Sequence, residues 1–133
     1  MIGGRVLDTS AIYAWSRRSP YMAAVAWSSV QDHTVIAIPI PALAAALGQI
    51  RERDWDIVDT LLDLPVTITT GDLTRASASS LAATLRPAGA HAPAALTAAS
   101  VVEAATSRGW PVLTAEPYPL NSLAPQLVIE HLP

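Results

Sequence analysis

The 133-residue chain contains no cysteine and no lysine, and only 14% of its residues are charged. The absence of cysteine excludes a disulfide framework and any metal site built from thiolates, and it fits a cytoplasmic protein. The net charge of -3 and the isoelectric point of about 5.4 argue against a strongly electrostatic nucleic-acid binder. Any binding to RNA is therefore expected to be weak.

Long hydrophobic runs are also missing. The longest one, residues 35–47, is interrupted by Pro39 and Pro41. It is also shorter than the roughly 18 apolar residues that span a bilayer, so no membrane helix is expected. Hydrophobic residues nevertheless make up 51% of the chain, which excludes intrinsic disorder and favours a tightly packed α/β or all-α domain. The length suits a single domain over residues 1–133.

Several common catalytic and cofactor signatures are absent. The pair Gly3-Gly4 precedes the first predicted strand instead of following it, so it cannot form a dinucleotide or phosphate loop. No Gly-x-Ser-x-Gly motif is present. The three histidines are too dispersed along the chain for metal-ligand spacing: His33, His91 and His131. These absences direct attention to the carboxylates.

Apolar runs rich in β-branched residues alternate with helical patterns along the chain. Strands are predicted over residues 4–7, 35–38, 66–69, 112–114 and 127–129, the last of them at a sheet edge. Helices are predicted over residues 9–15, 20–30, 41–50, 54–62, 72–86 and 93–107. This alternation predicts an α/β fold with right-handed crossovers, a mainly parallel sheet of four to five strands and helices on both faces.

Two further features concern proline and tryptophan. Pro117 and Pro119 follow the fourth predicted strand and predict a turn. Trp15, Trp27 and Trp55 lie on predicted helices among apolar neighbours, so we expect them in the core. An exposed tryptophan on these helices would instead mark a surface for a partner.

Two carboxylates stand at the ends of predicted strands. Asp8 closes the first strand, and Glu116 lies just past the end of the fourth. If these strands are neighbours, both carboxylates converge at the edge of the sheet where open α/β folds place ligands. Hard oxygen ligands of this kind suit Mg²⁺ or Mn²⁺. The alternatives are that Asp8 only caps a helix and that Glu116 is a surface loop residue.

Three segments resemble the PIN domain family: residues 6–11 (Val-Leu-Asp-Thr-Ser-Ala), residues 41–47 (Pro-Ala-Leu-Ala-Ala-Ala-Leu) and residues 109–117 (Gly-Trp-Pro-Val-Leu-Thr-Ala-Glu-Pro). The order of predicted strands and helices is similar as well. The resemblance implies a three-layer α/β/α fold. It also implies metal-dependent ribonuclease chemistry, in which three or four acidic residues surround one or two metal ions. Many members of the family are toxins of toxin–antitoxin pairs.

The resemblance assigns four acidic positions to this chain. The first falls on Asp8 and the fourth on Glu116, which is longer than the usual aspartate. The second falls on Ala45, and the third falls on Ala95 or Ala98, depending on the register chosen. The hydroxyl positions that line such a site are matched by Thr9, Ser10 and Thr114.

The alanines at the second and third acidic positions leave three interpretations of the function open. Two carboxylates should bind Mg²⁺ weakly and leave the attacking water without groups to position it, so we expect nuclease activity to be absent or strongly impaired. The chain would then be a binding or dimerisation module, with a second copy or a small antitoxin-like protein as its partner. The alternatives are a working Mg²⁺- or Mn²⁺-dependent endoribonuclease with Asp8 and Glu116 as ligands, or a toxin whose acidic residues were replaced by engineering.

Overall fold

The computed structural model describes residues 3–88 and 93–133, so His91 lies outside the described residues. Five strands form one sheet in the order β3-β2-β1-β4-β5, and each neighbouring pair is parallel. The strands are β1 (Gly4–Leu7), β2 (Val35–Pro39), β3 (Thr67–Thr70), β4 (Val112–Thr114) and β5 (Ile129–His131). The predicted three-layer α/β/α class is confirmed.

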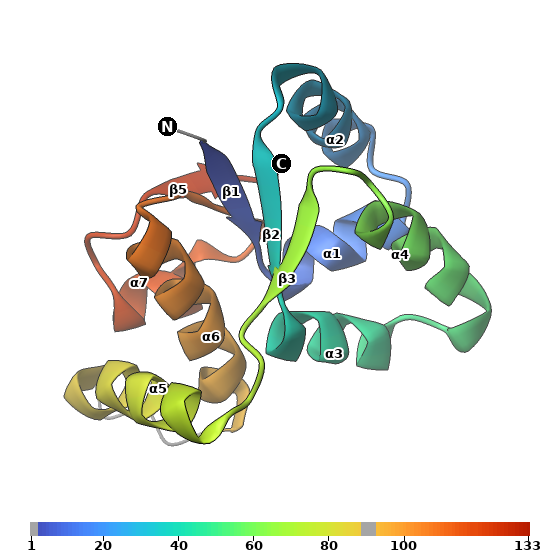
Figure 1. The fold of residues 1–133 in the computed structure, drawn as a ribbon. Helices are drawn as coiled ribbons and strands as arrows, with labels where there is room; N and C mark the ends of the chain where they lie inside the picture. The colour runs from blue at the N-terminus through green and yellow to red at the C-terminus, as the bar shows by residue number, and fades with distance from the viewer. Residues whose placement is uncertain (1–2, 89–92) are drawn as a thin grey trace.

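Helices cover both faces of this sheet (Figure 1). Those of the first half are α1 (Thr9–Ser16), α2 (Pro20–Asp32), α3 (Ile40–Gln49), the short 3-10 helix η1 (Glu52–Asp54) and α4 (Trp55–Leu62). Those of the second half are α5 (Arg75–Ala88), α6 (Pro93–Arg108) and α7 (Pro117–Leu123). Helices α1, α2 and α4 lie on one side of the sheet and α5, α6 and α7 on the other, while α3 contacts both α1 and α6 near the carboxyl ends of the strands.

The central strands are buried on both faces, which explains their unbroken apolar sequences. Their side chains are at most 1% exposed in β1, β2 and β4, at Val6, Leu7, Ile36, Ala37, Ile38, Val112 and Leu113. Full burial of each larger aliphatic side chain contributes about 1.5–3 kcal/mol. The segments where β1 passes into α1 and β4 into α7 therefore follow directly on fully buried strands, which fix their positions.

Close packing at the start of β1 depends on a glycine. A Cβ added at Gly4 would lie 2.8 Å from the carbonyl oxygen of Val35 and 2.9 Å from the ring of Trp110. Gly109, with φ of +68°, ends α6 and turns the chain so that Trp110 packs beside β1. These two glycines allow the segment from residue 109 to bring β4 against β1.

Two predictions about the last quarter of the chain are corrected. Pro117 and Pro119 do not make a simple turn, because both lie in the first turn of α7. The first helical positions need no amide donor, so proline is tolerated there. The edge strand β5 begins two residues later than predicted, because Ile129, not Leu127, pairs with Val112.

The prediction that three tryptophans lie in the core is wrong for Trp27, whose side chain is 67% exposed. The buried face of α2 is set by Met22, Val25, Ala26 and Ser29. Position 27 falls on the opposite side of that helix. Trp15 is half-buried, and its indole N–H donates to the carbonyl of Ile57 over 2.8 Å.

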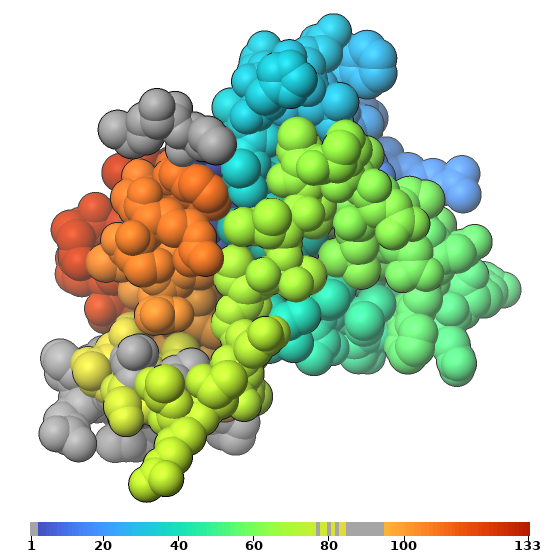
Figure 2. All heavy atoms as spheres, in the orientation of Figure 1, coloured from blue at the N-terminus to red at the C-terminus, as the bar shows by residue number. Residues whose placement is uncertain are grey.

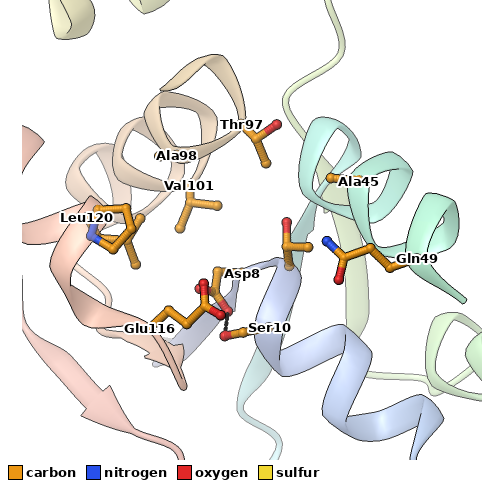
Figure 3. A pocket seen from close by; sticks show the side chains of 11 residues that line it. Asp8, Ser10, Ala45, Gln49, Thr97, Ala98, Val101, Glu116 and Leu120 are labelled. Carbon is orange, nitrogen blue, oxygen red and sulfur yellow. Dashed lines mark hydrogen bonds between the residues drawn. The ribbon is translucent and has the colours of Figure 1, made fainter. Parts of the chain in front are cut away.

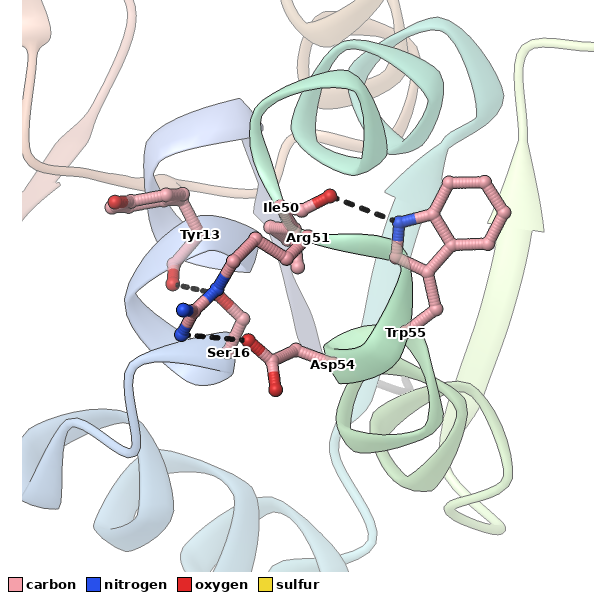
Figure 4. Close-up of polar contacts among 6 residues, drawn as sticks. All are labelled: Tyr13, Ser16, Ile50, Arg51, Asp54 and Trp55. Atoms are coloured by element: carbon pink, nitrogen blue, oxygen red, sulfur yellow. Dashed lines mark hydrogen bonds and ion pairs between the residues drawn. The ribbon is translucent and has the colours of Figure 1, made fainter.

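Trp55 is 39% exposed, and its indole N–H donates a hydrogen bond at the carboxyl end of α3 (Figure 4). Its N–H lies 3.2 Å from each of the carbonyl oxygens of Leu47 and Ile50. These carbonyls lie at the carboxyl end of α3, where intrahelical donors run out. Nearby, Arg51 and Asp54 form an ion pair of 3.3 Å. The indole therefore closes α3 instead of filling the core.

Within the described ranges, no helix combines the length and the hydropathy that crossing a bilayer would require.

Candidate functional site

The predicted neighbourhood of the first and fourth strands is observed. Strands β1 and β4 pair in parallel, with Val6 opposite Val112 and Leu7 opposite Leu113. Asp8 follows β1, and Thr114 is the last residue of β4, so the two lie side by side at the carboxyl edge of the sheet. Both are buried, with Thr114 fully enclosed and Asp8 8% exposed.

The Asp8 carboxylate is held by three donors. Its Oδ1 accepts the backbone N–H of Ala11 over 3.0 Å and the hydroxyl of Ser10 over 2.7 Å. Its Oδ2 accepts the hydroxyl of Thr114. Asp8 is therefore the N-cap of α1, and its second oxygen also ties α1 to the end of β4.

The two hydroxyls are in turn held by the backbone after β4. The amide of Ala115 donates to Ser10 Oγ over 2.8 Å, and the amide of Glu116 donates to Thr114 Oγ1 over 2.8 Å. Each hydroxyl carries one proton. When both protons point at the ionised Asp8, the 3.2 Å contact between the two hydroxyl oxygens carries no hydrogen bond of its own. The backbone donors thus set the direction in which Ser10 and Thr114 donate.

Burial raises the pKa of Asp8 above its ordinary value of 3.8. The hydrogen bonds from Thr114, Ser10 and Ala11 act in the opposite direction because they stabilise the ionised form. The charge of Glu116 raises the pKa further. The two carboxylates are therefore close enough to repel each other, and neither has an ionic partner among the ion pairs of the described residues.

Glu116 lies in a different environment from Asp8. It is exposed, and although it is the N-cap of α7, its side chain makes no capping hydrogen bond. In Figure 3 its carboxylate points toward the same space as Asp8. Residues 3–88 and 93–133 contain no group of three or more His, Cys, Asp or Glu side chains arranged to hold a metal ion.

A cavity of about 270 Å³ opens between the two strand ends and helices α3, α6 and α7. It is lined by Asp8, Thr9, Ser10, Ala45, Gln49, Thr97, Ala98, Val101, Glu116, Pro119 and Leu120. Most of the predicted site residues thus share one cavity, in which α3 and α6 face each other across the carboxylates (Figure 3). Asp8 and Glu116 are the two acidic residues of this lining.

The lining distinguishes the two registers left open for the third acidic position. Ala98 lies on the cavity, whereas Ala95, almost one turn earlier on α6, does not line it. Ala45 faces the same space from α3. At both positions the side chain is a methyl group, which offers no ligand to a cation.

Thr9 has a second contact that the sequence did not indicate. Its hydroxyl donates to the carbonyl of Ala42 over 3.3 Å, and this links the first turn of α1 to α3. Thr114 does not appear in the cavity lining, because its hydroxyl is turned to Asp8. Of the three predicted hydroxyls, Thr9 and Ser10 reach the cavity and Thr114 lies behind Asp8.

Two polar residues of the cavity, Gln49 and Thr97, were missed by the sequence analysis. Gln49 lies one turn after Ala45 on α3, so helical spacing places both on one face. Thr97 directly precedes Ala98 on α6. The helical spacing of Gln49 from Ala45 is the sequence signal that places it on the cavity. Both side chains are neutral, so they supply dipoles to the cavity and no charge.

Comparison with known proteins supports the fold. No protein-family model matches the sequence, and no curated protein matches it. A chain from the crystal structure of VapBC2 from Rickettsia felis, bound to a DNA fragment from their promoter, is similar in structure, with a TM-score of 0.68, 15% identity and 98% of each chain covered. PAE2754 from Pyrobaculum aerophilum is also similar, with a TM-score of 0.62, 16% identity, and 97% of this chain and 92% of that chain covered. The chain therefore has a PIN-like α/β/α fold.

Proposed function

We propose that this chain is a PIN-like protein whose acidic cavity does not sustain metal-dependent cleavage of phosphodiesters and that it acts as a binding module. One observation carries the proposal. Methyl groups of Ala45 and Ala98 line the cavity at the positions where the family resemblance expects carboxylates. The cavity retains two carboxylates, Asp8 and Glu116.

The donor set supports this proposal. Oδ1 of Asp8 already accepts two hydrogen bonds and Oδ2 accepts one, so one of its four lone-pair sites is left. Glu116 is exposed, makes no side-chain capping hydrogen bond, and has no ion-pair partner among the residues that the structure describes. Mg²⁺ requires near-octahedral oxygen geometry and gives up water reluctantly. One engaged carboxylate and one unfixed carboxylate fit neither Mg²⁺ nor Mn²⁺ well.

A protein partner is the second part of the proposal. The structurally similar chain comes from the crystal structure of VapBC2 bound to a DNA fragment from their promoter. Loss of catalysis would leave the folded surface of such a component intact, because the cavity is separate from most of the helical exterior. An antitoxin-like protein or a second copy of the chain is the partner class that this likeness favours.

A weak ribonuclease dependent on Mg²⁺ or Mn²⁺ is the alternative. It is favoured by the convergence of Asp8 and Glu116 on one cavity, to which Gln49, Thr97 and Ser10 add neutral oxygens. In that case Asp8 and Glu116 would hold the ion, which would supply a nucleophilic hydroxide when bound.

Cleavage of single-stranded RNA in the presence of Mn²⁺ tests the proposal. Wild type is expected to be inactive, and the double variant Ala45→Glu with Ala98→Asp is expected to gain metal-dependent cleavage. The matched control, Ala44→Glu with Ala95→Asp, adds the same charges outside the cavity and should stay inactive. Wild-type cleavage that Asp8→Asn abolishes would contradict the proposal and support the alternative.

A further inference from the structure

A second cavity lies between α5, α6 and the end of α7, where these three helices pack on one another. Figure 2 shows this part of the molecule on the side opposite α4. The cavity has a volume of about 410 Å³, whereas the acidic cavity has about 270 Å³. Sites for small molecules usually measure roughly 300–1,000 Å³ and are common between packed helices. By size, the second cavity is therefore the better candidate for a small-molecule site.

Helix α6 separates the two cavities. Thr97, Ala98 and Val101 face the acidic cavity, whereas residues 102, 103, 106 and 107 line the second one. At 100° per residue these two sets fall on opposite sides of the helix. The floor of the second cavity is aliphatic and is formed by Val102, Leu123 and Ala124.

The polar side chains of this cavity carry a single charge. Glu103 is half-buried and has no ion-pair partner within the described ranges. The other polar members are neutral: Thr84, Thr106, Ser107 and Gln126. Hydroxyl and amide side chains both donate and accept hydrogen bonds. The cavity therefore presents one anion beside several neutral hydrogen-bonding groups.

The guanidinium of Arg108 is engaged beside the cavity. It lies 5.8 Å from the centre of the Trp110 ring, and its Nη1 lies 3.3 Å from the carbonyl oxygen of Ala104. The same nitrogen donates to Ser107 Oγ over 3.2 Å, and that hydroxyl donates to the Ala104 carbonyl over 3.3 Å. Ser107 Oγ therefore keeps one lone pair for a ligand.

The lining excludes several classes of ligand. Its described members include no arginine and no aromatic residue, so they neither attract an anion such as phosphate nor stack on a nucleobase. A single carboxylate is a poor site for a divalent ion, which takes several oxygen ligands. A purely apolar ligand would leave Glu103 and its neutral neighbours without partners. A small organic cation that also carries hydroxyl groups satisfies both the charge and the neutral groups.

We propose that this cavity binds a small hydroxylated amine of the amino-sugar class. Its ammonium group pairs with Glu103, its hydroxyls bond to the neutral polar side chains, and its C–H face covers the aliphatic floor. Thr106, Ser107 and Gln126 are exposed, so the mouth of the cavity is open to water. Ion pairs that water reaches contribute little, and the affinity is therefore expected to be in the millimolar range.

Titration of isotope-labelled protein with D-glucosamine, observed by NMR at about pH 6 where its amine is protonated, tests the site. The backbone amides of residues 102–107 are expected to shift in a saturable manner, while those of Asp8 and Ser10 stay unchanged. D-Glucose, which has a hydroxyl in place of the amine, should bind at least tenfold more weakly. Absence of saturable shifts, shifts centred on the acidic cavity, or equal binding of the two sugars would each overturn the proposal.

Two substitutions with matched controls test whether binding occurs in this cavity. Glu103→Gln removes the charge and keeps the shape, so glucosamine affinity should fall at least tenfold, while Asp59→Asn at an exposed site on α4 should leave it unchanged. Ala83→Trp places a ring in the cavity from an exposed position and should abolish binding, whereas Ala78→Trp, on α5 outside the lining, should not. Circular dichroism checks that each variant is folded. Binding that either Glu103→Gln or Ala83→Trp leaves intact would overturn the proposal.

This inference goes beyond the proposed function, because the two cavities share no lining residue. A chain that cleaves RNA would contradict the proposed function alone. A chain that binds no glucosamine would contradict this inference alone.

Discussion

The two central strands end in the same way but in different environments. Strand β1 passes into α1 through Asp8, and β4 passes into α7 through Glu116, so each strand is followed by an acidic N-cap residue. The side chain of Asp8 caps its helix, is buried and accepts three hydrogen bonds. The side chain of Glu116 is exposed and caps nothing. Equivalent places in the sheet therefore do not give equivalent roles.

This difference gives the buried acidic residue a structural role that is independent of the chemistry of the cavity. Asp8 joins β1, α1 and β4 through Ser10 and Thr114, so its contribution to stability does not depend on any ligand. Glu116 has no comparable hydrogen-bond network among the described residues. We therefore infer that Asp8 contributes to the stability of the folded chain and that Glu116 contributes little.

Asp8→Ala is expected to have the largest effect. It removes the N-cap of α1, which is worth about 0.5–2 kcal/mol, and leaves the hydroxyls of Ser10 and Thr114 without their acceptor. We expect the free energy of unfolding at neutral pH to fall by about 2–4 kcal/mol in total. Urea denaturation measures this change. A loss below about 0.5 kcal/mol would show that the Asp8 network contributes no net stability.

Thr114→Val should have the next largest effect. Valine keeps the shape in the fully buried site but removes the donor to Asp8 Oδ2 and the acceptor for the amide of Glu116. We expect a loss of about 1–2 kcal/mol in the free energy of unfolding. Thr69→Val, which alters an exposed threonine at the far edge of the sheet, is the control and should change little. Equal losses in Thr114→Val and Thr69→Val would show that the hydrogen bonds of Thr114 make no particular contribution to stability.

The pH dependence of stability should separate Asp8 from the other acids. The pKa of Asp8 is raised in the folded state, so between pH 3.8 and that raised pKa the folded chain binds more protons than the unfolded chain. Proton uptake by Asp8 therefore stabilises the folded chain most below this range, and this titration-linked part of its contribution to the free energy of unfolding is lost as the pH rises through it. The hydrogen bonds that cap α1 still stabilise the folded chain at neutral pH. Wild type should thus lose stability relative to Asp8→Asn over this range. Parallel pH profiles for the two proteins would contradict the assigned burial.

Glu116→Ala should have the smallest effect. The side chain is exposed and makes no capping bond, so we expect the free energy of unfolding to change by less than about 0.5 kcal/mol. Thermal and urea denaturation measure it alongside Asp8→Ala. A loss as large as that of Asp8→Ala would show that Glu116 and Asp8 contribute equally to stability and would contradict the difference inferred between them.

The fold was predictable because its signals are local. Unbroken apolar runs predicted the central strands, and the pairing of β1 with β4 was confirmed. The helix α7 was missed because Pro117 and Pro119 look like turn residues until their place in a first helical turn is known. Trp27 was misplaced because apolar composition was weighed above helical phase: the periodic face of α2 is complete without it.

The cavity was predictable only in part. Asp8 and Glu116 could be brought together in advance because strand ends meet at one edge of a parallel sheet. Whether Ala95 or Ala98 faces them depends on the rotation of α6, which the sequence does not fix. The difference in burial between Asp8 and Glu116 also depends on contacts between side chains that lie more than a hundred residues apart in the sequence, such as the hydrogen bond from Thr114 to Asp8.

Calorimetric titration with Mn²⁺ most directly tests the claim that the cavity does not hold a catalytic metal ion, because it measures binding of the ion without requiring a substrate. We expect no saturable binding to wild type and clear binding to the Ala45→Glu, Ala98→Asp double variant. Tight, saturable binding to wild type that Asp8→Asn abolishes would contradict it.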